Sequence, residues 1–171
     1  MSNEPCAQTD EVDRIISAWY GVRPDMDTAP LAVVSRLTRV NHHMEALRKQ
    51  VFSESGLEPW EFDVLSTLRR AGEAHEMTPG DLTRETLVTS GTMTVRVAKL
   101  GKRGLIVRLP DPEDGRGAIV RLLPDGVDLV DKAMERLLER EQEMLRDLSP
   151  TEREGLAASL RVLLLSLNEE R

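Results

Sequence analysis

Apolar residues recur every three or four positions in five segments of the chain, which places them along one face of a helix. The segments are residues 11–20, 30–52, 60–70, 127–145 and 150–167. This spacing predicts amphipathic helices, because residues three and four apart lie on the same side of an α-helix. Aromatic residues make up only 3% of the chain, so we expect the helices to enclose an aliphatic core.

Two further helix starts lie close together after residue 77. Thr78 precedes Pro79, which gives an N-cap followed by a proline at the first helical position. Thr89 and Ser90 offer polar caps for a second helix. That second helix should turn an apolar stripe inward and place a polar set outward: Met93, Val97 and Leu100 inside, and Thr92, Thr94, Lys99 and Lys102 outside.

Two β-favouring runs follow, residues 105–109 and 118–123. The eight residues between them are rich in Pro, Asp and Gly, which favour a turn. Helix, turn, helix and hairpin in this order predict a mainly α fold with a small β-wing, the winged helix-turn-helix. Arg116 at the tip of such a wing is well placed to enter a minor groove.

Charge separates this prediction from a generic helical domain. The chain has 23 basic and 30 acidic residues and a net charge of −7, which argues against a nonspecific nucleic-acid coat. Residues 91–121 nevertheless hold seven basic and three acidic residues, a net charge of +4, while the rest of the chain carries −11. One basic patch on an acidic body is typical of a site-directed DNA-binding protein, although an isolated run of charge is more often only a solvated face.

The same segment resembles the DNA-binding core of MarR-type transcriptional regulators. The matching residues are Asp81-Leu82, Ser90 to Val97, Leu100, Arg103 to Ile106, and the wing residues Asp111 to Arg116. The resemblance runs from about Leu31 to Leu167; it departs at Gly115, where a second basic wing residue is common, and at residues 123–126, which lack the usual Thr before the proline. It implies a dimer formed by both chain ends that binds a pseudopalindromic double-stranded operator. The candidate DNA-binding residues are Thr89, Ser90, Thr92, Thr94, Arg96, Lys99, Lys102 and Arg116.

The two C-terminal helices fit the predicted dimer. Ser149 and Glu152 flank Pro150 in a capping box, so the second of these helices has a sharp start. The DNA-binding region has its own small core, so the leucines of these helices would stay unburied within one chain, and a two-fold interface would bury them. The alternative is that the two helices simply pack on each other within one chain. We therefore divide a single compact domain into residues 1–56 (extension and first scaffold helix), 57–123 (DNA-binding region) and 124–171 (dimerisation helices).

The N-terminal extension resembles that of the urate-responsive subgroup of MarR-type regulators. Four residues carry this resemblance: Trp19, Asp63, Arg96 and Arg108. It implies a site for a small anionic effector and a signal to the DNA-contacting helix. Asp63 lies among apolar residues, so we expect it to be partly buried and paired with Arg96. An entering anion would break that pair and release the DNA. The resemblance, and not the residues themselves, implies that the bound protein acts as a repressor.

Other interpretations stay open at this stage. Trp19 could merely anchor the extra helix, Asp63 and Arg96 could form a structural ion pair, and Arg108 could only touch phosphate. The ligand could be urate or xanthine, or instead a polycarboxylate or phenolic acid, because two arginines bind any of these anions. A protein-interaction module without DNA binding would explain the leucine-rich ends but not the basic patch.

Several classes of function find little support. No GxSxG, Walker, HExxH or dinucleotide glycine motif occurs, so we expect neither an enzyme nor a cofactor. We expect no metal site, because His42 and His43 point about 100° apart on a helix and His75 stands alone; we expect these histidines on the surface or in a pocket wall. Cys6 has acidic neighbours and is not expected to be reactive. No membrane span or signal peptide is evident, so we expect a cytoplasmic protein.

Overall fold

The computed structural model describes residues 9–112 and 117–169, and the chain divides into two compact units, residues 1–48 and 49–171. The described residues form seven helices and three short strands, so the predicted mainly α fold with a small β-wing is confirmed. The boundary between the units falls inside α2 (Leu31–Glu54), the helix predicted at residues 30–52.

The N-terminal unit pairs α1 (Glu11–Val22) with the first part of α2. Asp10 begins α1, because its carboxylate accepts hydrogen bonds from the backbone N–H groups of Val12 and Asp13 at 2.8 and 3.0 Å. The same carboxylate and that of Asp13 receive the guanidinium of Arg36, both at 2.7 Å. Val12 is fully buried. A cap, ion pairs and one buried valine therefore hold α1 in this unit.

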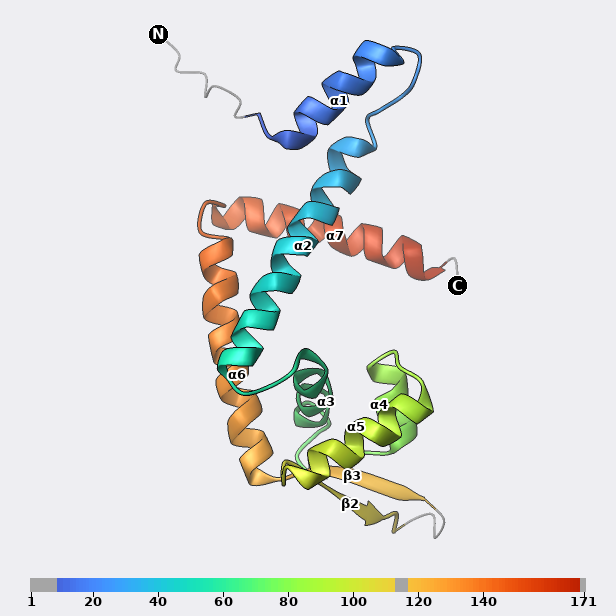
Figure 1. Ribbon diagram of the computed structural model, residues 1–171, viewed down its shortest axis with the longest axis vertical. Coiled ribbons are helices and arrows are strands. Elements are labelled where there is room, and N and C mark those ends of the chain that lie inside the picture. The colour runs from blue at the N-terminus through green and yellow to red at the C-terminus, as the bar shows by residue number, and fades with distance from the viewer. Residues whose placement is uncertain (1–8, 113–116, 170–171) are drawn as a thin grey trace. The chain divides into compact units, whose positions relative to one another are not determined.

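The second unit is built around α3 (Pro59–Arg69), which contributes Val64, Leu65 and Leu68 to an aliphatic core. The end of α2 joins this core through Phe52, whose ring stacks on that of Phe62 with centroids 4.2 Å apart. The short α4 (Pro79–Glu85) and the longer α5 (Ser90–Lys102) follow as a helix-turn-helix. Figure 1 shows α3 and α5 side by side, with the hairpin beyond α5.

The wing is a three-stranded antiparallel sheet in the order β1-β3-β2. The predicted hairpin is confirmed as β2 (Ile106–Pro110) and β3 (Ala118–Leu122), with Arg108 opposite Val120. The strand β1 (Glu76–Met77) was not predicted, because two residues are too short to show a period. It pairs with β3 and so attaches the wing to the chain just before α4.

The two C-terminal helices differ in how they pack. α6 (Pro124–Met144) packs on α3 and buries Val130, Ala133 and Leu137. The expectation that the leucines of these helices stay unburied within one chain is therefore wrong for Leu137. α7 (Pro150–Glu169) buries none of its described side chains. Its predicted capping box is confirmed: the Ser149 N–H donates to Glu152 Oε2 at 2.8 Å, and the Glu152 N–H donates to Ser149 Oγ at 3.3 Å.

Among the described residues, none of the helices has the length and apolar character needed to cross a membrane.

Candidate nucleic-acid interface

Both helices of the helix-turn-helix begin at the predicted caps. Thr78 Oγ1 accepts the Asp81 N–H at 3.1 Å at the start of α4, and Thr89 Oγ1 accepts the Thr92 N–H at 3.3 Å at the start of α5. The turn between them passes through Leu87, which has φ 52° and a side chain 88% exposed. The turn is therefore made by a left-handed residue that is not glycine.

α5 presents an inner and an outer face, as predicted. Met93, Val97 and Leu100 are buried at helical spacing. The outer side chains are exposed: Thr92, Thr94, Lys99 and Lys102. Val95 also lies outside and is 55% exposed; sequence reasoning missed it, although its offset of two positions from both Met93 and Val97 places it away from the inner stripe.

Polar groups gather at the first turn of α5. The hydroxyls of Thr89 and Thr92 lie 2.9 Å apart, and the Thr94 hydroxyl donates to the Ser90 carbonyl oxygen at 2.9 Å. The first backbone N–H groups of a helix lack carbonyl partners within it and carry a partial positive charge. This end of α5 is thus suited to a phosphate oxygen, with hydroxyls beside it.

Arg96 and Lys99 lie over the ring of Trp60 at the start of α3. The Arg96 Cζ atom is 5.5 Å and the Lys99 Nζ atom 5.9 Å from the ring centroid, which is cation–π distance. Sequence reasoning had not selected Trp60. Asp63, expected to be partly buried, is exposed instead, because it lies on the side of α3 opposite the buried Val64, Leu65 and Leu68; its pairing with Arg96 stays a prediction.

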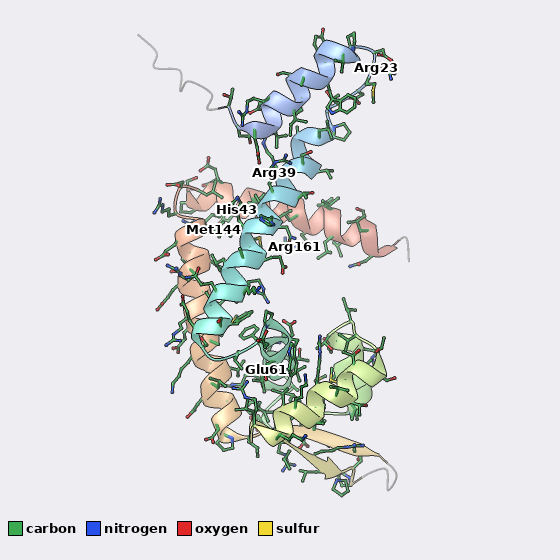
Figure 2. All side chains as sticks on the ribbon, viewed as in Figure 1. Arg23, Arg39, His43, Glu61, Met144 and Arg161 are labelled. Carbon is green, nitrogen blue, oxygen red and sulfur yellow. The ribbon has the colours of Figure 1, made fainter. Side chains whose placement is uncertain are left out.

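A different carboxylate joins α3 to the end of α5. Glu61 is only 5% exposed, and its Oε2 atom receives Arg103 Nη1 at 2.6 Å and the Glu58 N–H at 3.0 Å (Figure 2). Arg103, the C-cap residue of α5, also donates to the Gly56 carbonyl oxygen at 3.0 Å. Sequence reasoning missed this pair. The only signal was an acidic residue at the third position of the helix that Pro59 begins, where a carboxylate usually serves as a cap.

A cavity of about 260 Å³ lies between α5 and the wing. Its wall is mostly apolar: Pro79, Thr94, Val97, Ala98, Gly101, Ile106 and Arg108. Arg108 is exposed on β2 and is the only ionisable side chain among these lining residues. The cavity therefore combines apolar walls with one fixed positive charge and one hydroxyl.

The other predicted site residues lie elsewhere. Trp19 belongs to residues 1–48 and is 45% exposed on α1, while Asp63, Arg96 and Arg108 belong to residues 49–171. Arg116 in the wing and Cys6 in the N-terminal segment fall outside the described residues.

The histidines form no metal centre in the described part of the chain, where no three His, Cys, Asp or Glu side chains are arranged to hold an ion. His42 and His43 meet edge to face, with ring centroids 6.0 Å apart. His75 is half-buried rather than a surface residue, and its Nε2 lies 3.2 Å from Arg69 Nη1. Arg69 is held in turn by Asp131 at 2.9 Å, so His75 belongs to the joint of α3 and α6.

Comparison with known proteins agrees with this architecture. A model of the MarR family matches residues 55–117. The HTH-type transcriptional regulator PecS of Dickeya dadantii (strain 3937) is 32% identical over 150 residues, which cover 88% of this chain and 90% of PecS.

Two solved structures show the same fold. Bordetella bronchiseptica BpsR, whose DNA binding is regulated by 6-hydroxynicotinic acid, is 28% identical with a TM-score of 0.65, covering 77% of this chain and 91% of BpsR. A MarR variant from E. coli complexed with operator DNA is 24% identical with a TM-score of 0.66, covering 91% of this chain and 99% of that one. These relatives are regulators of transcription and not enzymes. The chain belongs to the MarR family of DNA-binding, winged helix-turn-helix transcriptional regulators.

Proposed function

We propose that this regulator is a homodimeric repressor that leaves a pseudopalindromic operator when a small planar anion binds. The observation that carries the proposal is the cavity between α5 and the wing. It is lined by apolar side chains and by the Arg108 guanidinium, and one of its walls is α5, the helix with the polar outer face. A ligand there would touch the DNA-contacting helix itself.

DNA contact is assigned to the outer face of α5 and to the wing. Thr89, Ser90 and Thr92 surround the N-terminal end of α5, where phosphate is favoured. Thr94, Lys99 and Lys102 follow along the exposed side, joined by Arg96 beside Trp60. Arg116 is the wing contact, for the minor groove or its phosphates.

The dimer is proposed from α7. Leu156, Leu160, Leu163 and Leu164 are all substantially exposed within one chain, and an apolar surface of this extent is characteristic of a contact with another protein surface. A two-fold axis would place two α5 helices in successive major grooves, about 34–36 Å apart. A pseudopalindromic operator follows from that symmetry.

The ligand class follows from the cavity. Its single arginine favours one carboxylate or an equivalent anion, and its apolar walls favour a flat ring. Urate, xanthine or a phenolic acid meets both requirements, and the relative BpsR is regulated by a heterocyclic acid. A polycarboxylate fits less well, because one arginine would leave the second charge against apolar walls.

Fluorescence anisotropy with DNA from the region upstream of the protein's own gene tests the proposal. The complex should weaken steeply with salt, since phosphate contacts release counterions. Urate, xanthine, a phenolic acid and a small polycarboxylate are then titrated into the complex. Release by one planar anion at constant salt supports the proposal; specific binding that no planar anion reverses contradicts the ligand-relieved mechanism.

Variants separate the parts of the site. Arg108→Gln should abolish the response while the unliganded protein still binds DNA. Arg96 does not line the cavity, but it lies on α5, which forms one cavity wall, so a ligand at Arg108 would act on the predicted Asp63–Arg96 pair through α5. Asp63→Asn tests this switch, and normal release by that variant would contradict it. Trp19→Phe tests whether Trp19 takes part in the response. Thr92→Ala and Thr94→Ala should change sequence preference, whereas Arg116→Ala should weaken binding to all sequences.

A further inference from the structure

The first turn of α3 faces three cations of the DNA-contacting helix. Arg96, Lys99 and Arg103 follow each other at intervals of three and four residues, so they share one side of α5. Their partners are two consecutive residues: the Trp60 ring lies beneath Arg96 and Lys99, and Glu61 binds Arg103. This side of α5 is next to its buried stripe and is turned to α3.

We propose that Trp60 and Glu61 are positioning residues for DNA binding, which hold the cations and the axis of α5 in place before DNA arrives. The inference rests on the proposed use of α5 to contact DNA and assigns a role to two residues of α3 that do not themselves reach the duplex.

The chemistry of Trp60 supports this role. An indole face attracts cations electrostatically and leaves their N–H groups free to bind other acceptors. Two long side chains that are held on one ring before binding lose less conformational entropy when they meet phosphate. Two cations on one ring also repel each other, and nearby phosphate charge relieves that repulsion. Trp60 is half-buried, and Arg96 and Lys99 lie over its ring on the side that does not pack in the core.

Glu61 supplies the fixed point. Its carboxylate is almost fully buried, held by the Glu58 N–H at 3.0 Å and by Arg103 at 2.6 Å. The Nη2 atom of Arg103 also donates to the Gly56 carbonyl oxygen at 3.0 Å. Loss of a cationic partner leaves a buried carboxylate without compensation for its charge, so the bond to Arg103 holds the end of α5 against α3.

The test uses a duplex that the parent protein selects from a random pool, with a random duplex beside it. Trp60→Leu should weaken specific binding about three- to ten-fold, and Trp60→Phe should restore most of the loss because it keeps an aromatic face. In an Arg96→Ala, Lys99→Ala background, Trp60→Leu should cause no further loss. Equal losses in both backgrounds would show that Trp60 only fills space, and an unchanged affinity for Trp60→Leu would also overturn its role.

The role of Glu61 is tested by neutralising its carboxylate, with an exposed glutamate as the control for the change in charge. Glu61→Gln should weaken specific binding more than random-duplex binding, whereas Glu73→Gln, in an exposed turn, should change neither. Circular dichroism and sedimentation confirm that each variant keeps its fold and its state of assembly. If Glu61→Gln behaves like Glu73→Gln, its positioning role is wrong. If the parent protein itself selects no duplex, the proposed DNA contacts of α5 are wrong, and this inference is wrong with them. That result differs from one in which the parent binds DNA but Trp60 and Glu61 do not affect the binding.

Discussion

Gly126 sets how closely α6 approaches the segment that leaves α5. A Cβ atom at this position would lie 2.3 Å from the Leu105 carbonyl oxygen and 2.8 Å from Leu122 Cδ1. The carbonyl oxygen accepts the Leu123 N–H at 3.0 Å, so it cannot move without disturbing the start of β2. We expect Gly126→Ala to lower the free energy of unfolding by roughly 1–3 kcal/mol, measured by urea denaturation.

Gly21 in α1 provides the control, since a Cβ atom there meets nothing within 4 Å. Gly21→Ala should leave stability unchanged or raise it by up to about 1 kcal/mol, because alanine favours helix. A Gly126→Ala protein as stable as the parent would show that α6 and the α5–β2 connection adjust freely.

Leu87 bears a conformational cost in the turn before α5. Its backbone has a φ of 52°, which is unfavourable for a residue with a Cβ atom. Its side chain is 88% exposed, so packing contributes little to offset this conformational cost. Leu87→Asn should stabilise the protein by roughly 0.5–1 kcal/mol, since asparagine accepts this region more readily. Thermal unfolding measures the change. Leu87→Ala, which keeps the unfavourable φ, should raise stability by less. An equal rise in stability would show that the effect comes from removing the exposed leucine and not from the backbone conformation.

At the scale of elements, the docking of α1 on α2 depends on an ionised carboxylate. The Arg36 guanidinium, together with the backbone N–H of Asp13, lowers the pKa of Asp10 from 3.8 to about 2. A lowered folded-state pKa means that the stabilisation is fully present above about pH 4 and is lost as pH falls through about 2. The cap and the ion pair with Arg36 should therefore loosen together in that window.

Carbon-detected NMR of the Asp10 carboxyl group checks this prediction. The midpoint should lie near pH 2 in the parent protein and rise toward the ordinary value in Arg36→Gln. Arg23→Gln, whose partner Asp25 lies in the connection after α1, should leave the Asp10 midpoint in place. An Asp10 midpoint near 3.8 in the parent would mean that the pair does not hold α1 in solution.

The elements that sequence predicted well are those with local causes. Thr78, Thr89 and Ser149 cap helices through bonds to residues three positions later, and such bonds are visible as sequence spacing. The strand β1 has no such signal, since Glu76 and Met77 become a strand only by pairing with β3. Apolar spacing also placed the inner face of α5 correctly, because its buried residues repeat along one helix.

At the scale of the whole molecule, the proposed dimer depends on α7. Leu163 is among its exposed leucines, and a charge there would have to be buried in a two-fold interface at high cost. Leu163→Glu should give monomers in sedimentation and weaken operator binding on the order of 100-fold, through loss of bivalent contact. Ala74→Glu, an equivalent change in an exposed turn, should do neither. A Leu163→Glu protein that stays dimeric would place the interface elsewhere.

The sequence by itself determined the order of helices and wing, the caps, the inner and outer faces of α5 and the family, because each depends on residues close together in the chain. Only the tertiary structure decided which side chains meet across elements. It exposed Asp63 on α3, buried Glu61 against Arg103, placed Arg96 and Lys99 over Trp60, and formed the cavity at Arg108. The physical reason is that neighbouring residues on a helix point in different directions. Whether Glu61 or Asp63 is buried against α5 therefore depends on how α3 is rotated about its axis. Packing of the whole core fixes that rotation.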